Sequence, residues 1–141
     1  MSDVDLKRLI NENAATLREL HRRIHETFLH RDETTEGYHE WGDTCKQFHA
    51  SYDQLAFPGG YDRALDRIVD GDPNAVESAI CFLERRPYFF RSGYMFQKLL
   101  RRVGHAPLTN DQARRFQQVL VKRDLWRSIK KRKRNPVTKP Q

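Results

Sequence analysis

Five residues between positions 91 and 102 combine positive charge with an aromatic ring at the spacing of one helix face. They are Arg91, Tyr94, Lys98, Arg101 and Arg102. In an α-helix, side chains three or four positions apart lie next to each other on the surface. Cations on such a face contact phosphates and an exposed ring stacks on a base, which is how single-stranded nucleic acid is held without sequence readout. The pattern therefore predicts a surface that contacts the backbone of RNA or DNA.

More cations follow this face along the chain. Arg114, Arg115 and Lys122 extend the basic character into the next helical segment, and a dense run follows: Lys130, Lys131, Arg132, Lys133 and Arg134. This run has no apolar periodicity and its like charges repel one another, so we expect residues 130–141 to form a disordered basic arm. The run fits either an arm that lies along nucleic acid or a nuclear-localisation signal, and the sequence does not separate the two.

Charge is divided between the two parts of the chain. Residues 1–84 contain 9 Lys and Arg against 17 Asp and Glu, whereas residues 85–141 contain 17 Lys and Arg against 2 acids. A field of one sign over half of a small protein attracts a partner of the opposite sign. We therefore expect a nucleic acid or an acidic protein as the partner, and a charge-driven association between copies of the chain as a further outcome.

Two residue pairs in the first half have the spacing of metal ligands. His21 and His25 are four positions apart, as are Cys45 and His49. In an antiparallel pair of helices these four side chains, all of types that zinc prefers, would approach one another. However, the registers of the two pairs are offset by about one helical turn, and histidines at the edge of an apolar stripe commonly fill space between helices. We therefore expect neither a metal nor a cofactor.

No motif in the chain specifies a reaction. The sequence contains no P-loop, no dinucleotide fingerprint and no nucleophile elbow. Acids of the first half recur every seven positions, as at Glu12, Glu19 and Glu26, which is typical of the solvated side of an amphipathic helix. We expect a non-catalytic binding protein, with a helical nuclease that uses an acidic metal cluster as the weaker alternative.

Apolar residues recur with a period near 3.6 throughout the chain, which predicts an all-α protein. Two helix starts have clear signals, because Asp72 and Pro73 suit the first positions of a helix and Thr109 with Gln112 forms a capping box. We expect an irregular helical bundle or a short α-solenoid of about six helices. These cover residues 4–30, 36–56, 61–70, 73–86, 89–103 and 109–129.

The expected helices fall into two groups. The first two are joined by a short polar turn and should form an antiparallel helical hairpin over residues 1–57. Pro58-Gly59-Gly60 then breaks the chain. Residues 61–129 are expected to form two helix pairs. Their succession of helices and turns is similar to that of HEAT-type helix pairs, although the sequence contains no repeat signature. We expect both groups to form one domain, residues 1–129.

Two apolar residues near the end of the last helix lie on the side opposite to the one that is expected to face the core. Val121 and Leu125 lie across the helix from Phe116 and Val119. An exposed apolar patch of this kind suits docking to another protein. The runner-up hypothesis is therefore a helical-repeat adaptor or immunity-type module. A base-reading helix–turn–helix is less favoured, since the break between residues 103 and 109 is longer than the usual tight turn.

The chain has the composition of a cytoplasmic protein. It has no apolar run of the roughly 18 residues needed to cross a bilayer, and residues 1–5 lack the pattern of a secretory signal. Cys45 and Cys81 lie within helical patterns and are expected to be buried free thiols. We therefore expect a cytoplasmic location and no contact with membranes.

Overall fold

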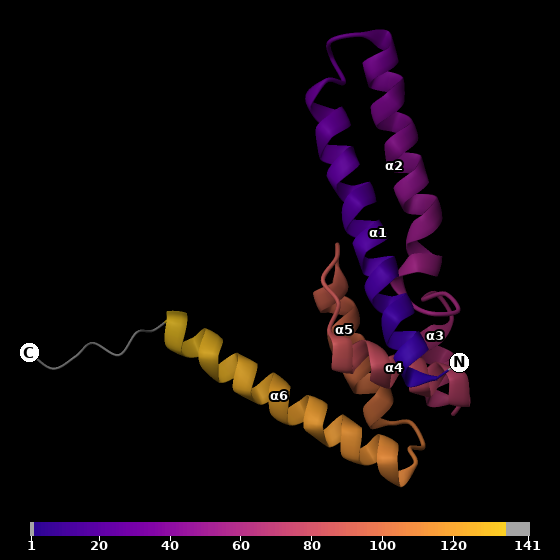
Figure 1. Ribbon diagram of the computed structural model, residues 1–141, viewed down its shortest axis with the longest axis vertical. Helices are drawn as coiled ribbons and strands as arrows, with labels where there is room; N and C mark the ends of the chain where they lie inside the picture. Colours follow the sequence, from indigo (N-terminus) through magenta and orange to yellow (C-terminus); the bar gives the residue numbers. More distant parts are fainter. Residues whose placement is uncertain (1, 135–141) are drawn as a thin grey trace, which may run out of the picture. The chain divides into compact units, whose positions relative to one another are not determined.

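The computed structural model describes residues 2–134. Within this range the chain forms six α-helices and no β-strand (Figure 1), which confirms the all-α prediction. The helices form two compact units, α1–α5 and α6, divided between Pro107 and Leu108, where the sequence analysis places no boundary. The helices are α1 (Asp3–Leu29), α2 (Thr35–Ala56), α3 (Ala64–Val69), α4 (Pro73–Arg85), α5 (Ser92–Gly104) and α6 (Asn110–Arg134).

Both predicted helix starts are confirmed by hydrogen bonds. The Asp72 side chain accepts hydrogen bonds from two N–H groups of the first turn of α4, and Pro73 is the first residue of that helix. At the start of α6, the Gln112 N–H donates to Oγ1 of Thr109 at 3.1 Å, and the Thr109 N–H donates to Oε1 of Gln112 at 3.1 Å. These bonds satisfy donors that a helix end leaves without partners.

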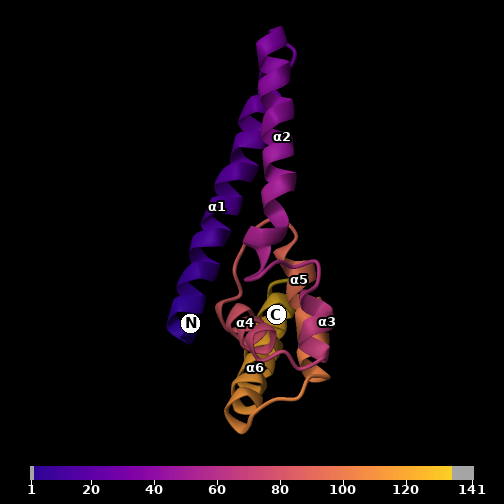
Figure 2. The same ribbon diagram turned by 90° about the vertical axis from the view of Figure 1, so that its right-hand side faces the viewer.

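α1 and α2 lie side by side and run in opposite directions (Figures 1 and 2). Ring contacts define their register, because Phe28 lies 5.9 Å from Trp41 and His21 lies 5.6 Å from Phe48, centroid to centroid. Leu17, in the part of α1 that is packed against other helices, is fully buried, whereas Phe28 near the turn is 41% exposed. Near the turn, the two helices extend beyond α3, α4 and α5 (Figure 2).

α4 is the central helix of the first unit. Every residue from Ala75 to Leu83 except Glu77 is buried, because α1, α3 and α5 all pack against this helix. A helix that is apolar on nearly all sides needs such enclosure. The side chain of Cys81 is fully buried in this core, whereas Cys45 on α2 is half-buried, and neither cysteine forms a disulfide within the described residues.

α5 begins three residues later than the periodicity predicts. Residues 87–91 form a loop, in which the Phe89 N–H donates to Oγ of Ser92 at 3.1 Å. Within the helix, Met95 is 3% exposed and belongs to the core, whereas Gly93 is exposed.

α6 continues five residues beyond its expected end. The run of like charges predicts disorder from Lys130, but residues 130–134 are helical. Lys and Arg are good helix formers, and cations in the last turn interact favourably with the helix dipole. These two effects oppose the like-charge repulsion on which the prediction of disorder depends. The prediction is therefore wrong for residues 130–134, and its remainder, residues 135–141, lies outside the described residues.

Candidate nucleic-acid interface

All five residues of the expected binding face lie on the exposed side of α5. Arg91 is the N-cap residue, and Tyr94, Lys98, Arg101 and Arg102 are exposed along the helix. We call these five residues the basic face of α5. Because the opposite side of α5 is buried, all four cations of this face point toward solvent. The buried side consists of Met95, Phe96, Leu99, Leu100 and Val103.

None of the four cations on the basic face of α5 forms an ion pair with a carboxylate of residues 2–134. Two cations of α1 are compensated in this way, since Lys7 lies 3.4 Å from Glu84 and Arg8 lies 2.6 Å from Asp5. The first turn of α5 also contains no acid. An incoming anion therefore meets this face without having to displace an internal carboxylate.

A pocket of about 380 Å³ adjoins the basic face of α5. We call it the tyrosine pocket. Three of its six lining residues are aromatic, two are cationic and none is acidic. The end of α2, the loop before α3 and the start of α5 contribute the lining residues, which are Tyr52, Tyr61, Arg91, Tyr94, Met95 and Lys98.

The loop after α2 holds Tyr61 in place. The Asp53 carbonyl accepts a hydrogen bond from the Tyr61 N–H at 3.1 Å, and the Asp53 carboxylate accepts one from the Asp62 N–H at 2.6 Å. Gly60 has a φ of +91°, and a Cβ atom there would lie 2.9 Å from the Asp53 carboxylate. Glycine is therefore required at this turn, and the turn determines where Tyr61 lies.

Tyr52 is held by its hydroxyl group. This group donates a hydrogen bond to the Phe90 carbonyl at 2.7 Å and lies 3.8 Å from the Met95 sulfur. Burial, followed by the nearby Tyr61, raises the pKa of the Tyr52 phenol, and burial also raises the pKa of the Tyr61 phenol against an opposing effect of Arg102. Both phenols are therefore neutral at neutral pH and add no negative charge to the pocket.

Neither Tyr52 nor Tyr61 is predicted as a site residue from the sequence. The periodicity of α2 assigns Tyr52 to an apolar stripe, and Tyr61 is expected at the start of the third helix. One available signal is the Gly59-Gly60 dipeptide, which predicts a sharp turn directly before Tyr61. Such a turn can bring the following residue back toward the end of α2, as the bond to Asp53 shows.

Arg91 has an unusual backbone conformation. Its φ is +66°, in the left-handed region that costs a non-glycine residue about 1–2 kcal/mol. The guanidinium carbon lies 5.4 Å from the centroid of the Phe90 ring, and that ring stacks on His21 of α1 at 5.0 Å. Strained backbone of this kind is concentrated at functional sites, so the loop before α5 is a candidate part of the interface.

The cations of α6 differ in their availability. Arg114 lies 2.6 Å from Asp111, and Arg115 lies 4.0 Å from the same carboxylate with its side chain only 11% exposed. Both are therefore less suited to bind an added anion than the sequence predicts. Lys122 is exposed, as are the cations of the last turns: Lys130, Lys131, Arg132, Lys133 and Arg134.

The histidine and cysteine pairs do not assemble a metal site. His21 is surrounded by rings, with Phe90 at 5.0 Å, Phe48 at 5.6 Å and His25 at 4.8 Å between centroids. Burial, followed by the charge of His25, holds the pKa of His21 below its ordinary value. Among residues 2–134, no group of three or more His, Cys, Asp and Glu side chains is placed to hold a metal ion. His21 is thus a packing residue.

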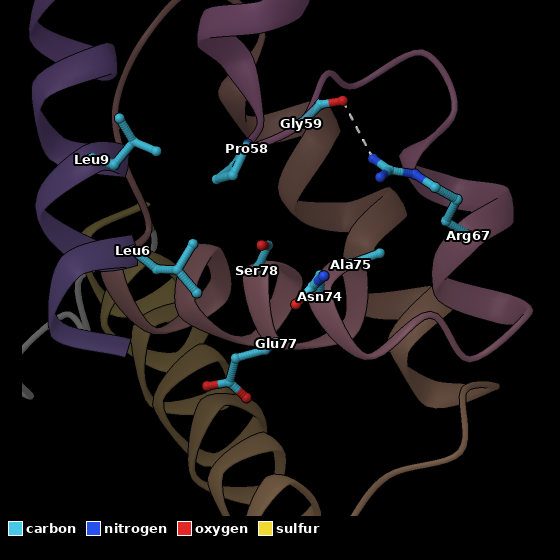
Figure 3. A pocket seen from close by; sticks show the side chains of 9 residues that line it. All are labelled: Leu6, Leu9, Pro58, Gly59, Arg67, Asn74, Ala75, Glu77 and Ser78. Atoms are coloured by element: carbon cyan, nitrogen blue, oxygen red, sulfur yellow. Dashed lines mark hydrogen bonds between the residues drawn. The ribbon is translucent and has the colours of Figure 1, made fainter. Parts of the chain in front are cut away.

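A second hollow, of about 450 Å³, is lined by α1, the loop after α2, α3 and α4 (Figure 3). The Arg67 guanidinium at this hollow donates to the carbonyl oxygens of Gly59 and Gly60 at 3.5 and 3.4 Å. The acidic residue Glu77 and the apolar residue Leu6 line the same space. Arg67 is the one cationic residue that lines this hollow, and its guanidinium is engaged by two carbonyl oxygens, so the hollow does not fit a polyanion.

Apolar side chains are exposed along one side of α6. Val121 is 65% exposed, Leu125 is 61% exposed and Ile129 is 39% exposed, each four positions after the one before. We call these three residues the α6 stripe. Phe116 and Val119, on the other side of the helix, are buried. Both residues that the sequence analysis selects for a protein partner are therefore exposed.

Comparison with known proteins gives no family for this chain. No family model, no curated protein and no solved structure matches it significantly. Of the helices in residues 2–134, none has both the length and the apolar character needed to cross a bilayer. The basic face of α5, the tyrosine pocket and the α6 stripe are therefore the features that indicate what the protein binds.

Proposed function

We propose that this protein is a non-catalytic binding protein that contacts the phosphate backbone of nucleic acid through the basic face of α5. One observation carries the proposal. Four exposed cations without an ion-pairing carboxylate among residues 2–134 lie on one side of a helix whose other side is buried. A cationic face of this kind binds phosphates by releasing condensed counterions and carries no sequence information.

The composition of the face suits phosphate. Three of its four cations are arginines, whose planar guanidinium groups bind phosphate oxygens in pairs, and Lys98 adds a compact point charge. The helix orients these groups before the ligand arrives, which lowers the entropy cost of binding. The exposed cations of α6 would raise the association rate through long-range attraction rather than through fixed contacts.

A second candidate function depends on the α6 stripe. Exposed apolar side chains next to Lys122 and the cations of residues 130–134 suit an acidic protein partner, or the acidic part of another copy of this chain. The protein would then act as an adaptor or immunity-type module. We also propose the finer architecture that the sequence predicts, which is a helical hairpin followed by a short solenoid of stacked helix pairs. A cytoplasmic location is proposed as well.

Anisotropy of a labelled single-stranded oligonucleotide at low salt tests the main proposal. A triple variant, Lys98→Gln, Arg101→Gln and Arg102→Gln, should weaken binding by roughly tenfold or more, because three phosphate contacts are lost. Its matched control removes the same charge from three exposed positions of the same unit, Arg23→Gln, Lys46→Gln and Arg63→Gln. The control should change the affinity by less than about twofold, which is the effect of net charge alone.

Two results would contradict the proposal. Absence of binding by the wild-type protein at low salt would exclude the nucleic-acid function. Equal losses in the triple variant and its matched control would show that net charge, and not the basic face of α5, determines affinity.

A further inference from the structure

The tyrosine pocket differs from the rest of the basic face of α5 because it is concave and aromatic. Its volume of about 380 Å³ falls within the range of roughly 300–1,000 Å³ that small-ligand sites span. A phosphate backbone that lies on the convex surface of a helix needs no such hollow. The pocket therefore indicates that one part of the ligand turns away from the backbone and enters the protein.

Two walls of the pocket are in place before any ligand binds. Tyr52 is fixed by its hydrogen bond to the Phe90 carbonyl, and Tyr61 is fixed by the turn that Asp53 holds. Tyr94, at the start of α5, is 74% exposed and forms the rim. Flat rings that are already positioned favour a flat aromatic ligand, since little conformational entropy is lost on stacking.

Positive charge lies at the same site. Arg91 and Lys98 line the pocket, and Arg102 is close enough to Tyr61 to act on its phenol electrostatically. No lining residue carries a carboxylate, in contrast to a shallow hollow of about 460 Å³ on α2 that is lined by three. A ligand that combines an aromatic ring with an adjoining phosphate matches both features of the tyrosine pocket. A nucleotide has this combination.

We propose that the tyrosine pocket takes one unpaired base of a single strand, with the adjoining phosphate on Arg91 and Lys98. The inference rests on the proposed function and adds the class of ligand, single-stranded rather than duplex. A base within a duplex is stacked and paired, so it must leave the helix before it can enter a protein pocket. Because contact is through ring faces, all four bases are accepted.

The test compares two strands of equal length, one intact and one fully abasic, in anisotropy titrations with the full chain. The two carry the same number of phosphates, so only the bases distinguish them. The wild-type protein should bind the intact strand about 5- to 150-fold more tightly, which is the range that stacking of one base provides. Tyr94→Leu should reduce this ratio to near one while the salt dependence of binding stays unchanged.

Three controls keep the result specific. Tyr94→Trp retains a stacking ring and should preserve the preference for the intact strand. Tyr88 is 78% exposed and does not line the pocket, so Tyr88→Leu should have no effect. Circular dichroism should show that Tyr94→Leu folds as the wild type does, because that side chain is largely exposed.

Failure of this inference differs from failure of the proposed function. Equal affinity of the wild-type protein for the intact and the abasic strand would overturn the pocket assignment. If Lys98→Ala then weakened binding of both strands, the proposal of backbone binding would still stand. Equal affinity for a single strand and a duplex would also overturn the pocket assignment. A free nucleotide also combines a base with a phosphate, so a titration with adenosine monophosphate tests this alternative ligand. If it bound as tightly as the strand, the pocket would be assigned to free nucleotides instead.

Discussion

The Tyr52 hydroxyl donates a hydrogen bond to the Phe90 carbonyl at 2.7 Å. This bond joins the last part of α2 to the loop that precedes α5. The ring of Phe90 stacks on His21, so α1, α2 and this loop meet at one residue. Arg91 follows Phe90 directly, and its position therefore depends on contacts made by two helices that lie far from it in the sequence.

Tyr52→Phe should destabilise the protein and weaken its binding. The substitution keeps the ring but removes the bond to Phe90, which should lower the free energy of unfolding by about 0.5–1.5 kcal/mol. Oligonucleotide affinity should fall several-fold, because the loop that carries Arg91 is less well held. Urea unfolding followed by circular dichroism measures the first effect. Tyr38→Phe, at a residue that is 55% exposed, is the matched control, and an equal effect of both substitutions would contradict the role of this bond.

Arg91→Gly should separate stability from binding. Glycine adopts the left-handed conformation without steric cost, so the free energy of unfolding should stay the same or rise by up to about 1 kcal/mol. Affinity for a single strand should nevertheless fall, since one cation of the tyrosine pocket is lost. Urea unfolding and anisotropy titrations measure the two effects.

A clear loss of stability in the Arg91→Gly variant would show that the Arg91 side chain supports the fold. Unchanged affinity would show that this cation does not contact the ligand. Arg91→Lys provides the control for charge, because it keeps both the positive charge and the strained conformation. It should retain most of the binding.

His21 should make the protein less stable as the pH falls below about 6.5. Burial and the charge of His25 hold the pKa of His21 below its ordinary value of 6.5, so the unfolded chain binds a proton more readily than the folded one. Between these two pKa values the unfolded state holds more protons, and the free energy of unfolding decreases as the pH is lowered.

The comparison of urea unfolding at pH 7.5 and pH 5.5 tests this sign. His21→Phe keeps a ring between Phe48 and Phe90 but cannot titrate, so its stability should change less than that of the wild type over this interval. His105→Phe, at an exposed histidine, should behave as the wild type does. If His21 made the free energy of unfolding larger at pH 5.5 than at pH 7.5, the pKa shift of His21 would have the opposite direction and the prediction would be wrong.

The α6 stripe should be dispensable for nucleic-acid binding. Val121→Ser and Leu125→Ser replace side chains that are 65% and 61% exposed, and substitutions at such positions usually change stability by no more than about 0.5 kcal/mol. Oligonucleotide affinity should stay unchanged in the double variant. A large loss would move the binding site to α6, whereas loss of a co-purified acidic protein would favour the adaptor function.

Features that depend on near neighbours in the chain were predictable. The capping box of Thr109 and Gln112 and the start of α4 at Asp72 involve residues within one helical turn, and both are confirmed. The basic face of α5 was predictable for a similar reason, because the helical period alone decides which residues share a side. The exposure of Lys98 and Arg102 agrees with that periodicity.

Features that depend on distant contacts or on small energy differences were not predictable. Tyr52 and Tyr61 meet in one pocket only because of the bond to Phe90 and the turn held by Asp53, and no local pattern contains either contact. The end of α6 depends on a balance between helix propensity and charge repulsion, each worth only tenths of a kcal/mol per residue. Periodicity measures neither term, so the helix over residues 130–134 was missed.

The salt dependence of oligonucleotide binding shows whether the basic face of α5 contacts phosphates. For such contacts, the logarithm of the affinity should fall linearly with the logarithm of the salt concentration. Lys98→Ala should reduce the slope by about 0.7, the value for one phosphate contact on a single strand. Lys46→Ala, at an exposed lysine of α2, should leave the slope unchanged. Affinity that does not respond to salt, or an identical slope for all three proteins, would contradict backbone binding by the basic face of α5.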